Sequence, residues 1–247
     1  MEKNKILDRV NRLLVAYKEG RLGGEVMPED ANPGVPKGGT ENYVYFTLPM
    51  SLNYQRNSYT LWECACKSYL DDDTRSIFSP LLVYQMDIAV LREKLLKYKV
   101  ALQPNKQPVI WKTICTSVAE YFDGDIRNLF VLCDYSVMKT KQFLLEHKKA
   151  FPYLSGEKIM NYWLFVMQSY TDLSFCDRNQ ITVAPDTHVV QASVRLGLIT
   201  AEQSVKSDVR QIVAAKWDEL LHGTSLQPID IHTPLWLWSR SKFTIDI

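Results

Sequence analysis

A lysine and an aspartate, two residue types that cooperate in covalent catalysis, stand in contexts that could bring them to one site. Lys158 follows the short turn Leu154-Ser-Gly-Glu and precedes an apolar segment. Asp186 follows Pro185 and precedes Thr-His-Val-Val. A lysine amine becomes a nucleophile near neutral pH when it loses solvation, as the Lys158 amine would if it were buried against the apolar helix that follows. A rigidly held carboxylate can stabilise positive charge or take a proton from the amine.

Each residue also has an ordinary structural interpretation. A lysine in the first turn of a helix commonly points into solvent, and an aspartate at a helix start commonly caps it. Gly156, in the turn before Lys158, would let backbone N–H groups approach a phosphate at the start of the next helix. The chemistry therefore depends on the elements that position the two residues.

These elements are predicted to be helices. The segment 159–168 is apolar on nearly all sides, so we expect a central, buried helix there. Ser79-Pro80, Thr200-Ala-Glu-Gln203 and Thr233-Pro234 are typical of helix starts. Residues 20–42 form a Gly- and Pro-rich loop, and residues 43–49 are expected to be extended. Helices are expected at residues 5–17, 52–70, 79–98, 108–122, 125–130, 136–149, 159–168, 187–198, 200–222 and 233–243. The predicted fold class is all-α.

Composition limits the class of protein. The chain has 247 residues, of which 46% are hydrophobic and 23% are charged, enough for one core or for two lobes that share one. Its apolar runs are shorter than a membrane span, and its N-terminus lacks a signal-peptide pattern, so we expect a cytoplasmic protein without a membrane partner. The five cysteines have no metal-binding spacing, so neither a metal site nor a cofactor is predicted.

Charge is distributed unevenly although the net charge is only +1. A segregated basic surface could bind phosphates, whereas the alternative is a pair of solvated helix faces. Two runs supply most of the candidate cations, namely Arg92, Lys94, Lys97, Lys99, Lys106 and Lys112, and then Lys139, Lys141, Lys148, Lys149 and Lys158.

Taken together, the two motifs resemble the helix-hairpin-helix DNA glycosylase superfamily. In that family a hairpin of the form Leu-Pro-Gly-Val-Gly-x-Lys precedes a helix, a loop and a Val-Asp-x-His-Val-type segment. Gly156 and Lys158 match the hairpin, although Leu154 replaces its first glycine. Asp186 and His188 match the aspartate segment. The Arg-Leu-Gly-Leu sequence that commonly follows is present as residues 195–198.

The C-terminal segment Ile231-His-Thr-Pro-Leu-Trp236 looks like the closing helix of the archaeal 8-oxoguanine glycosylase branch. That resemblance implies Lys158 as nucleophile and Asp186 as its partner. It also implies a base pocket formed by Trp62, Tyr162, His232 and Trp236. His232 departs from the branch, which has an acid there, so the damaged base is open.

The resemblance implies an enzyme with two helical lobes that flank a DNA-binding cleft. Residues 1–45 would form an N-terminal helix and loop, and residues 46–247 the glycosylase fold, with a central lobe at about 75–185. Gln55 or Asn57 could fill the gap left by a flipped base, and Gly156 and His188 could contact DNA. The alternative for Gln55 and Asn57 is a polar junction between a helix and a loop.

The expected activity is that of a bifunctional glycosylase and lyase. It would excise a damaged purine, 8-oxoguanine above all, from duplex DNA through a Schiff base, acting as a monomer and associating with the nucleoid in a prokaryote. Two alternatives remain: a glycosylase for an alkylated or mismatched base, and a non-catalytic helical module that binds DNA or protein. The near-neutral charge and the missing hairpin glycine favour the last of these.

Overall fold

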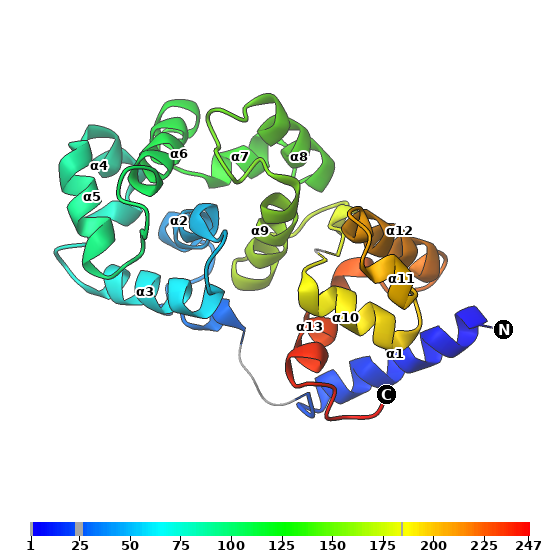
Figure 1. Cartoon of the computed structure of the whole chain (residues 1–247). Coiled ribbons are helices and arrows are strands. Elements are labelled where there is room, and N and C mark those ends of the chain that lie inside the picture. Colours follow the sequence, from blue (N-terminus) through cyan, green and yellow to red (C-terminus); the bar gives the residue numbers. More distant parts are fainter. Residues whose placement is uncertain (1, 23–26, 184) are drawn as a thin grey trace. The chain divides into compact units, whose positions relative to one another are not determined.

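The structure, a computed structural model, describes residues 2–22, 27–183 and 185–247 (Figure 1). Within these ranges every regular element is an α-helix or a short 3₁₀ helix, which confirms the all-α prediction. The chain divides into two compact units. Unit 1 comprises Met1–Val26 and Asn179–Ile247, so it uses both ends of the chain, and unit 2 comprises Met27–Arg178.

Unit 2 has an aromatic core. Trp163 on α9 donates its indole N–H to Thr47 on α2 over 3.2 Å, and Trp111 on α6 donates to the Ile77 carbonyl over 2.8 Å. These bonds satisfy the polar atoms of rings that are otherwise fully buried. The α-helices of this unit are α2 (Thr40–Thr47), α3 (Ser58–Leu70), α4 (Pro80–Gln85), α5 (Ile88–Lys97), α6 (Gln107–Phe122), α7 (Arg127–Leu132), α8 (Val137–Glu146) and α9 (Glu157–Tyr170).

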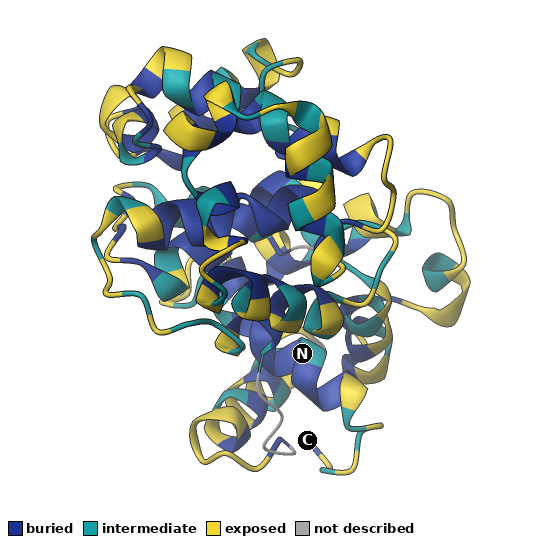
Figure 2. Cartoon of the chain, turned by 90° about the vertical axis from the view of Figure 1, so that its left-hand side faces the viewer, coloured by how far each residue is buried: buried dark blue, intermediate teal, exposed yellow. Residues whose placement is uncertain are grey.

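The helix after Lys158 is buried as predicted. Its buried residues are Met160, Asn161, Trp163, Leu164, Val166 and Met167. In Figure 2 individual helices carry buried and exposed stretches side by side, which is the pattern of amphipathic helices packed on a core.

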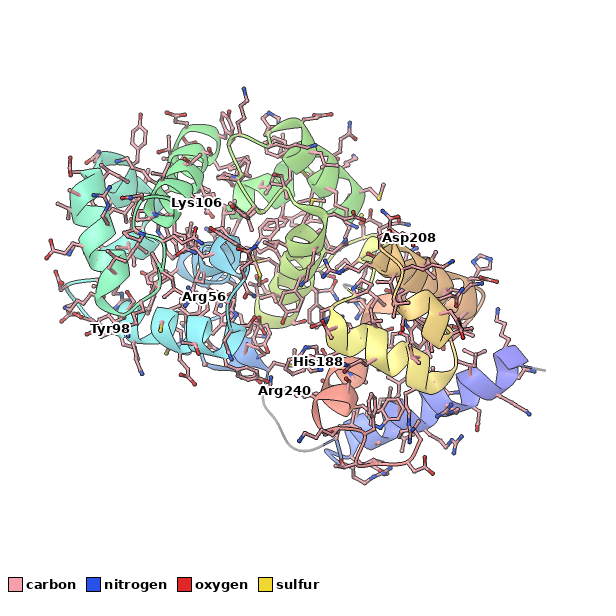
Figure 3. All side chains as sticks on the ribbon, in the orientation of Figure 1. Arg56, Tyr98, Lys106, His188, Asp208 and Arg240 are labelled. Atoms are coloured by element: carbon pink, nitrogen blue, oxygen red, sulfur yellow. The ribbon has the colours of Figure 1, made fainter. Side chains whose placement is uncertain are left out.

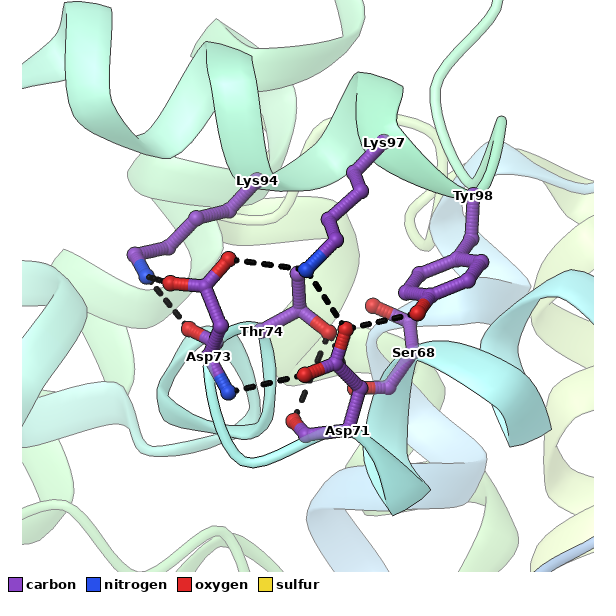
Figure 4. Close-up of polar contacts among 7 residues, drawn as sticks. All are labelled: Ser68, Asp71, Asp73, Thr74, Lys94, Lys97 and Tyr98. Atoms are coloured by element: carbon purple, nitrogen blue, oxygen red, sulfur yellow. Dashed lines mark hydrogen bonds and ion pairs between the residues drawn. The ribbon is translucent and has the colours of Figure 1, made fainter.

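The turn after α3 is tied to α5 by charged side chains (Figure 4). Asp71 accepts hydrogen bonds from Tyr98 and from the Asp73 backbone N–H, and it pairs with Lys97 at 2.7 Å. Asp73 pairs with Lys94 at 2.7 Å and with Lys97 at 3.1 Å. The Lys97 ammonium is the largest influence that lowers the pKa of Asp71, to about 2. Two cations of the first basic run therefore serve the fold.

Unit 1 joins the first helix to the last ones. Its α-helices are α1 (Glu2–Lys18), α10 (Thr187–Leu196), α11 (Ala201–Ser204), α12 (Val209–Leu221) and α13 (His232–Arg240). α10 packs against α13 and α12, and α1 packs against α13 and α10. In Figure 1 the blue α1 accordingly lies beside the red α13. Arg9 on α1 donates to the carbonyls of Ile247 and Leu196, each over 3.0 Å, so it fastens the two chain ends together.

Several helix boundaries follow the predicted caps. Ser79 accepts a hydrogen bond from the Leu82 N–H, and Thr200 and Gln203 form the reciprocal capping box. The Asp186 side chain caps α10. These signals are local, so they can be read from neighbouring residues alone.

Other boundary predictions were wrong. Residues 43–49 are not extended, because most of them belong to α2, and a wholly buried apolar run cannot be told from a strand by its periodicity. The helix predicted at 52–70 begins only at Ser58, because Asn57 caps it. The helix predicted at 79–98 breaks before Asp87, whose carboxylate caps α5 by accepting from Ala89.

The helix predicted at 200–222 is also two helices, α11 and α12. Val205, expected on its apolar stripe, lies between them with 84% of its surface exposed. Thr233 does not cap the last helix, because the 3₁₀ helix Pro228–Ile231 leads directly into α13 at His232.

The predicted long loop is partly ordered into helix. A 3₁₀ helix at Pro28–Asp30 and the start of α2 fall within residues 20–42, and residues 23–26 of that loop lie outside the described residues. In the described part of the chain, no helix combines the length and apolar character that a bilayer crossing requires.

Candidate functional site

Asp186 is held at both carboxylate oxygens. Oδ1 accepts from the Val189 backbone N–H over 3.0 Å, and Oδ2 accepts from the indole N–H of Trp236 over 3.2 Å. The first bond caps α10, and the second joins α10 to α13. The side chain is half-buried, so the carboxylate keeps one fixed orientation while remaining accessible.

His188 and Arg240 contact the ring of Trp236. The His188 ring meets it edge-on, with centroids 5.6 Å apart, and the Arg240 guanidinium lies 5.1 Å from the ring centre. Both residues are labelled in Figure 3. His188 Nδ1 lies 3.2 Å from the Ser239 hydroxyl, which donates its proton to Gln191 over 3.0 Å. Nδ1 of His188 is therefore the donor to Ser239. The structure thus brings together Asp186, His188 and Trp236.

Lys158 lies in the first turn of α9 and is exposed. Of the two interpretations of Lys158, the structure shows the surface lysine and not the buried amine, because the buried face of α9 begins at Met160. Within the described residues the Lys158 ammonium makes no hydrogen bond or ion pair. In the same part of the chain no side chain caps α9, whose N-cap is Gly156, so the first N–H groups of the helix have no side-chain acceptor there.

The turn before α9 departs from a glycine-rich hairpin. Gly156 has an ordinary extended backbone, and the left-handed residue is Tyr153, with φ of 66°. A Cβ at Gly156 would lie 3.2 Å from the Tyr153 carbonyl oxygen, so the glycine permits a close approach. Leu154 at the position of the first hairpin glycine is fully buried and anchors the turn.

Two stacked tyrosines join this turn to the loop that carries Gln55 and Asn57, the residues predicted to fill the gap left by a flipped base. The rings of Tyr54 and Tyr153 are nearly parallel, with centroids 4.0 Å apart. The Lys106 ammonium lies 5.4 Å from one centroid and 5.1 Å from the other (Lys106 is labelled in Figure 3). Gln55, next to Tyr54, is exposed in a left-handed conformation with φ of 51°.

Two further contacts hold this loop. Arg56 donates to the carbonyls of Val100 and Lys99 over 2.6 and 3.1 Å. Asn57 caps α3 by accepting from Thr60 over 3.2 Å. Asn57 therefore has a structural task, whereas Gln55 projects from a loop that is fixed on both sides.

Trp62 and Tyr162 meet at a carboxyl group that the sequence did not reveal. Glu29, in the 3₁₀ helix Pro28–Asp30, is completely buried and accepts from the Tyr162 hydroxyl, which lies 3.0 Å from each of its oxygens. Trp62 is also completely buried and packs against Tyr45 and Phe46.

Burial raises the pKa of Glu29 from an ordinary 4.5 to about 7. The Tyr162 hydroxyl and the Trp62 indole lower it by smaller amounts. Among the described residues the Trp62 N–H has no hydrogen bond of acceptable geometry, so its effect is that of a nearby dipole and not of a bond. No local pattern marks Glu29, because Tyr162 is 133 positions away.

His232 is buried at the start of α13, with 4% of its surface exposed. It belongs to unit 1 together with Asp186, His188 and Trp236, while Lys158, Gly156, Gln55, Asn57, Trp62 and Tyr162 belong to unit 2. The predicted site residues are thus divided between the two units.

Much of the predicted basic surface is engaged within unit 2. Besides Lys94 and Lys97, Lys139 pairs with Asp134 at 2.6 Å. Lys112 donates to backbone carbonyls, including that of Met86. These contacts favour the interpretation of the two runs as helix faces, with Lys99, Lys148, Lys149 and Lys158 as exposed exceptions.

All five cysteines are free thiols. Across the described ranges no cluster of His, Cys, Asp and Glu side chains is arranged to hold a metal ion. Neither a known protein-family model nor a curated protein matches this chain.

Proposed function

We propose that this protein is a DNA glycosylase with lyase activity that excises a damaged purine. The observation that carries the proposal is the carboxylate of Asp186, fixed by a backbone N–H and by the Trp236 indole. A carboxylate held in this way can face a developing positive charge without having to reorganise. The resemblance described above supplies the substrate, duplex DNA, and the partner residue, Lys158.

In this proposal the DNA binds in a cleft between two helical lobes, as the resemblance implies. The target nucleotide leaves the base stack, because its glycosidic bond is out of reach within the duplex. Gln55, on its fixed loop, takes the place of the departed base. The first turn of α9, which no side chain caps, supports binding of a backbone phosphate beside Lys158.

The chemistry begins with proton transfer. Asp186 takes a proton from the Lys158 ammonium, and the neutral amine attacks the sugar C1′. The glycosidic C–N bond breaks with its electron pair going to the base, which receives the proton that Asp186 holds. The sugar ring then opens as the amine forms an imine with C1′. Loss of a C2′ proton from this Schiff base eliminates the 3′ phosphate and nicks the strand.

The pocket for the base is proposed at Trp62, Tyr162, His232 and Trp236, with 8-oxoguanine as the substrate. Glu29 belongs to the same proposed pocket through its bond to Tyr162. His232, where the resembling branch has an acid, favours a second candidate within this class, a glycosylase for an alkylated or mismatched base.

The test is excision from four duplexes that carry 8-oxoguanine, an alkylated base, a mismatch or no lesion. Wild type is expected to excise 8-oxoguanine and to be trapped on it by borohydride. Lys158→Gln should lose both, with excision falling on the order of 10³-fold or more. Lys67→Gln, an exposed lysine of unit 2 outside the two basic runs, is the control and should behave as wild type.

Excision of the alkylated base alone would identify that base, and not 8-oxoguanine, as the substrate. Equal trapping of Lys158→Gln and wild type by borohydride would refute the assignment of Lys158 as the nucleophile. A helical DNA-binding module without chemistry, the remaining alternative, would bind the duplexes and excise from none.

A further inference from the structure

Unit 1 carries a groove of about 570 Å³ along one side of α10. It begins at Asp186 and runs to Arg195 in the last turn of that helix. Because α10 has ten residues, the groove follows a path on the order of 15 Å. Residues that line it are Asp186, Val190, Arg195, Val209, Arg210 and Phe243.

The charge of the groove is positive and uncompensated. Arg195 and Arg210 are both exposed, and in the described part of the chain neither forms an ion pair. Among the described residues that line the groove, Asp186 is the one acid, and both of its oxygens already accept hydrogen bonds. Two guanidinium groups are therefore available to an anion, which each can bind through paired N–H donors.

The far end of the groove is held in a strained conformation. Lys242 and Phe243 are both left-handed, with φ of 57° and 58°, where non-glycine residues are uncommon. The Phe243 backbone N–H donates to the Trp238 carbonyl, and the two rings meet edge-on at 4.8 Å. Phe243 in turn lies 5.9 Å from the Arg195 guanidinium. This packing fixes the ring that supports the arginine.

We propose that this groove binds the phosphodiester backbone of the DNA strand that Asp186 faces, with Arg195 and Arg210 each contacting a phosphate. This rests on the proposed function for the identity of the polymer. A small ligand is usually enclosed by its pocket, whereas both arginines here remain open to solvent. A strand that advances about 3.4 Å per nucleotide would reach Arg195 a few nucleotides from Asp186.

The experiment measures equilibrium binding of the full chain to an undamaged duplex over a range of salt concentrations. Each phosphate contact contributes about 0.9 to the slope of log affinity against log salt. Arg195→Gln/Arg210→Gln should therefore lower the slope by about 2 relative to wild type. The matched control is Lys5→Gln/Lys18→Gln, which removes the same charge from exposed positions on α1 and should lower the slope much less.

A second variant separates charge from geometry. Arg195→Lys/Arg210→Lys should restore the slope but bind several-fold more weakly than wild type, because lysine lacks the paired donors of arginine. Equal slopes for the glutamine variant and the α1 control would refute the proposal that the groove binds the DNA backbone. If wild type excises no lesion while the slope difference holds, the groove stands and the glycosylase proposal fails. Excision without any slope difference refutes the groove alone.

Discussion

Asp186 in unit 1 and Lys158 in unit 2 differ in how firmly they are held. Each Asp186 oxygen has a donor, one from the backbone of its own helix and one from Trp236 on α13. Lys158 is exposed in the first turn of α9, and its ammonium has no bonding partner within the described residues. In the proposed mechanism the carboxylate is therefore organised before the substrate arrives, whereas the amine is organised by the substrate.

The difference extends to a second carboxyl group. Glu29 is completely buried, and its pKa is about 7, while Asp186 is half-buried and receives two hydrogen bonds. Two acids in different units therefore have different tasks available to them. Asp186 is held by two donors at an accessible position, and Glu29 is poised to change its protonation near neutrality.

The largest effect that sharpens this comparison is expected for Asp186→Asn. The amide keeps one oxygen as acceptor for the α10 cap but loses the negative charge and the acceptor for the Trp236 indole. We expect the rate of lesion excision to fall by roughly 10² to 10³-fold, with a fall in melting temperature of only about 2–4 °C from the lost hydrogen bond. Asp208→Asn is the control, because Asp208 stands at the start of α12 without capping it (labelled in Figure 3). A rate within twofold of wild type for Asp186→Asn would remove the carboxylate from the mechanism.

The second prediction concerns how the stability of the protein depends on pH, and it is tested with Glu29→Gln. Glu29 has an ordinary pKa of 4.5 in the unfolded chain and a pKa of about 7 in the folded protein. The folded state thus binds more protons in that window, so stability falls as pH rises. The loss is about 1.4 kcal/mol per pH unit, on the order of 3 kcal/mol in total. Glutamine should abolish this part of the pH dependence.

The measurement is the free energy of unfolding in urea at pH 5 and pH 8. The wild-type free energy of unfolding should fall from pH 5 to pH 8 by on the order of 3 kcal/mol more than that of Glu29→Gln. Glu63→Gln, on the exposed side of α3, should follow the wild-type profile. Parallel profiles for wild type and Glu29→Gln would show that burial does not hold the proton.

The smallest effect tests the support of Asp186. Trp236→Phe removes the indole donor but keeps an aromatic ring between His188 and Arg240. The loss of one hydrogen bond, about 1 kcal/mol, should slow excision by about fivefold. Trp238→Phe removes an indole bond to the Ile245 carbonyl instead, so it should lower stability and leave the single-turnover rate unchanged. Equal excision rates for the two variants would show that the Trp236 indole does not contribute to catalysis through Asp186.

The sequence predicted those features that depend on neighbouring residues. Asp186 as a helix cap, the Thr200 capping box and the buried character of α9 all follow from side chains within one or two turns. The break before Asp87 was missed although it has a local signal, because an amphipathic pattern continues through it. The prediction of one continuous helix followed the amphipathic periodicity and overlooked Asp87 as a capping residue.

Features that depend on distant residues could not be predicted. The bond between Trp236 and Asp186 spans 50 positions, and the bond between Tyr162 and Glu29 spans 133. The exposure of Lys158 could not be decided for a related reason. A helix that is apolar on average still has an exposed first turn, and only packing decides where its buried face begins.

The most direct test of the central claim is to locate the covalent adduct. The full chain is reduced with borohydride while it acts on a duplex that contains 8-oxoguanine, and the DNA-linked peptide is sequenced by mass spectrometry. The account predicts one adduct, on the Lys158 side chain. An adduct on another amine, or excision that leaves no adduct at all, would contradict it.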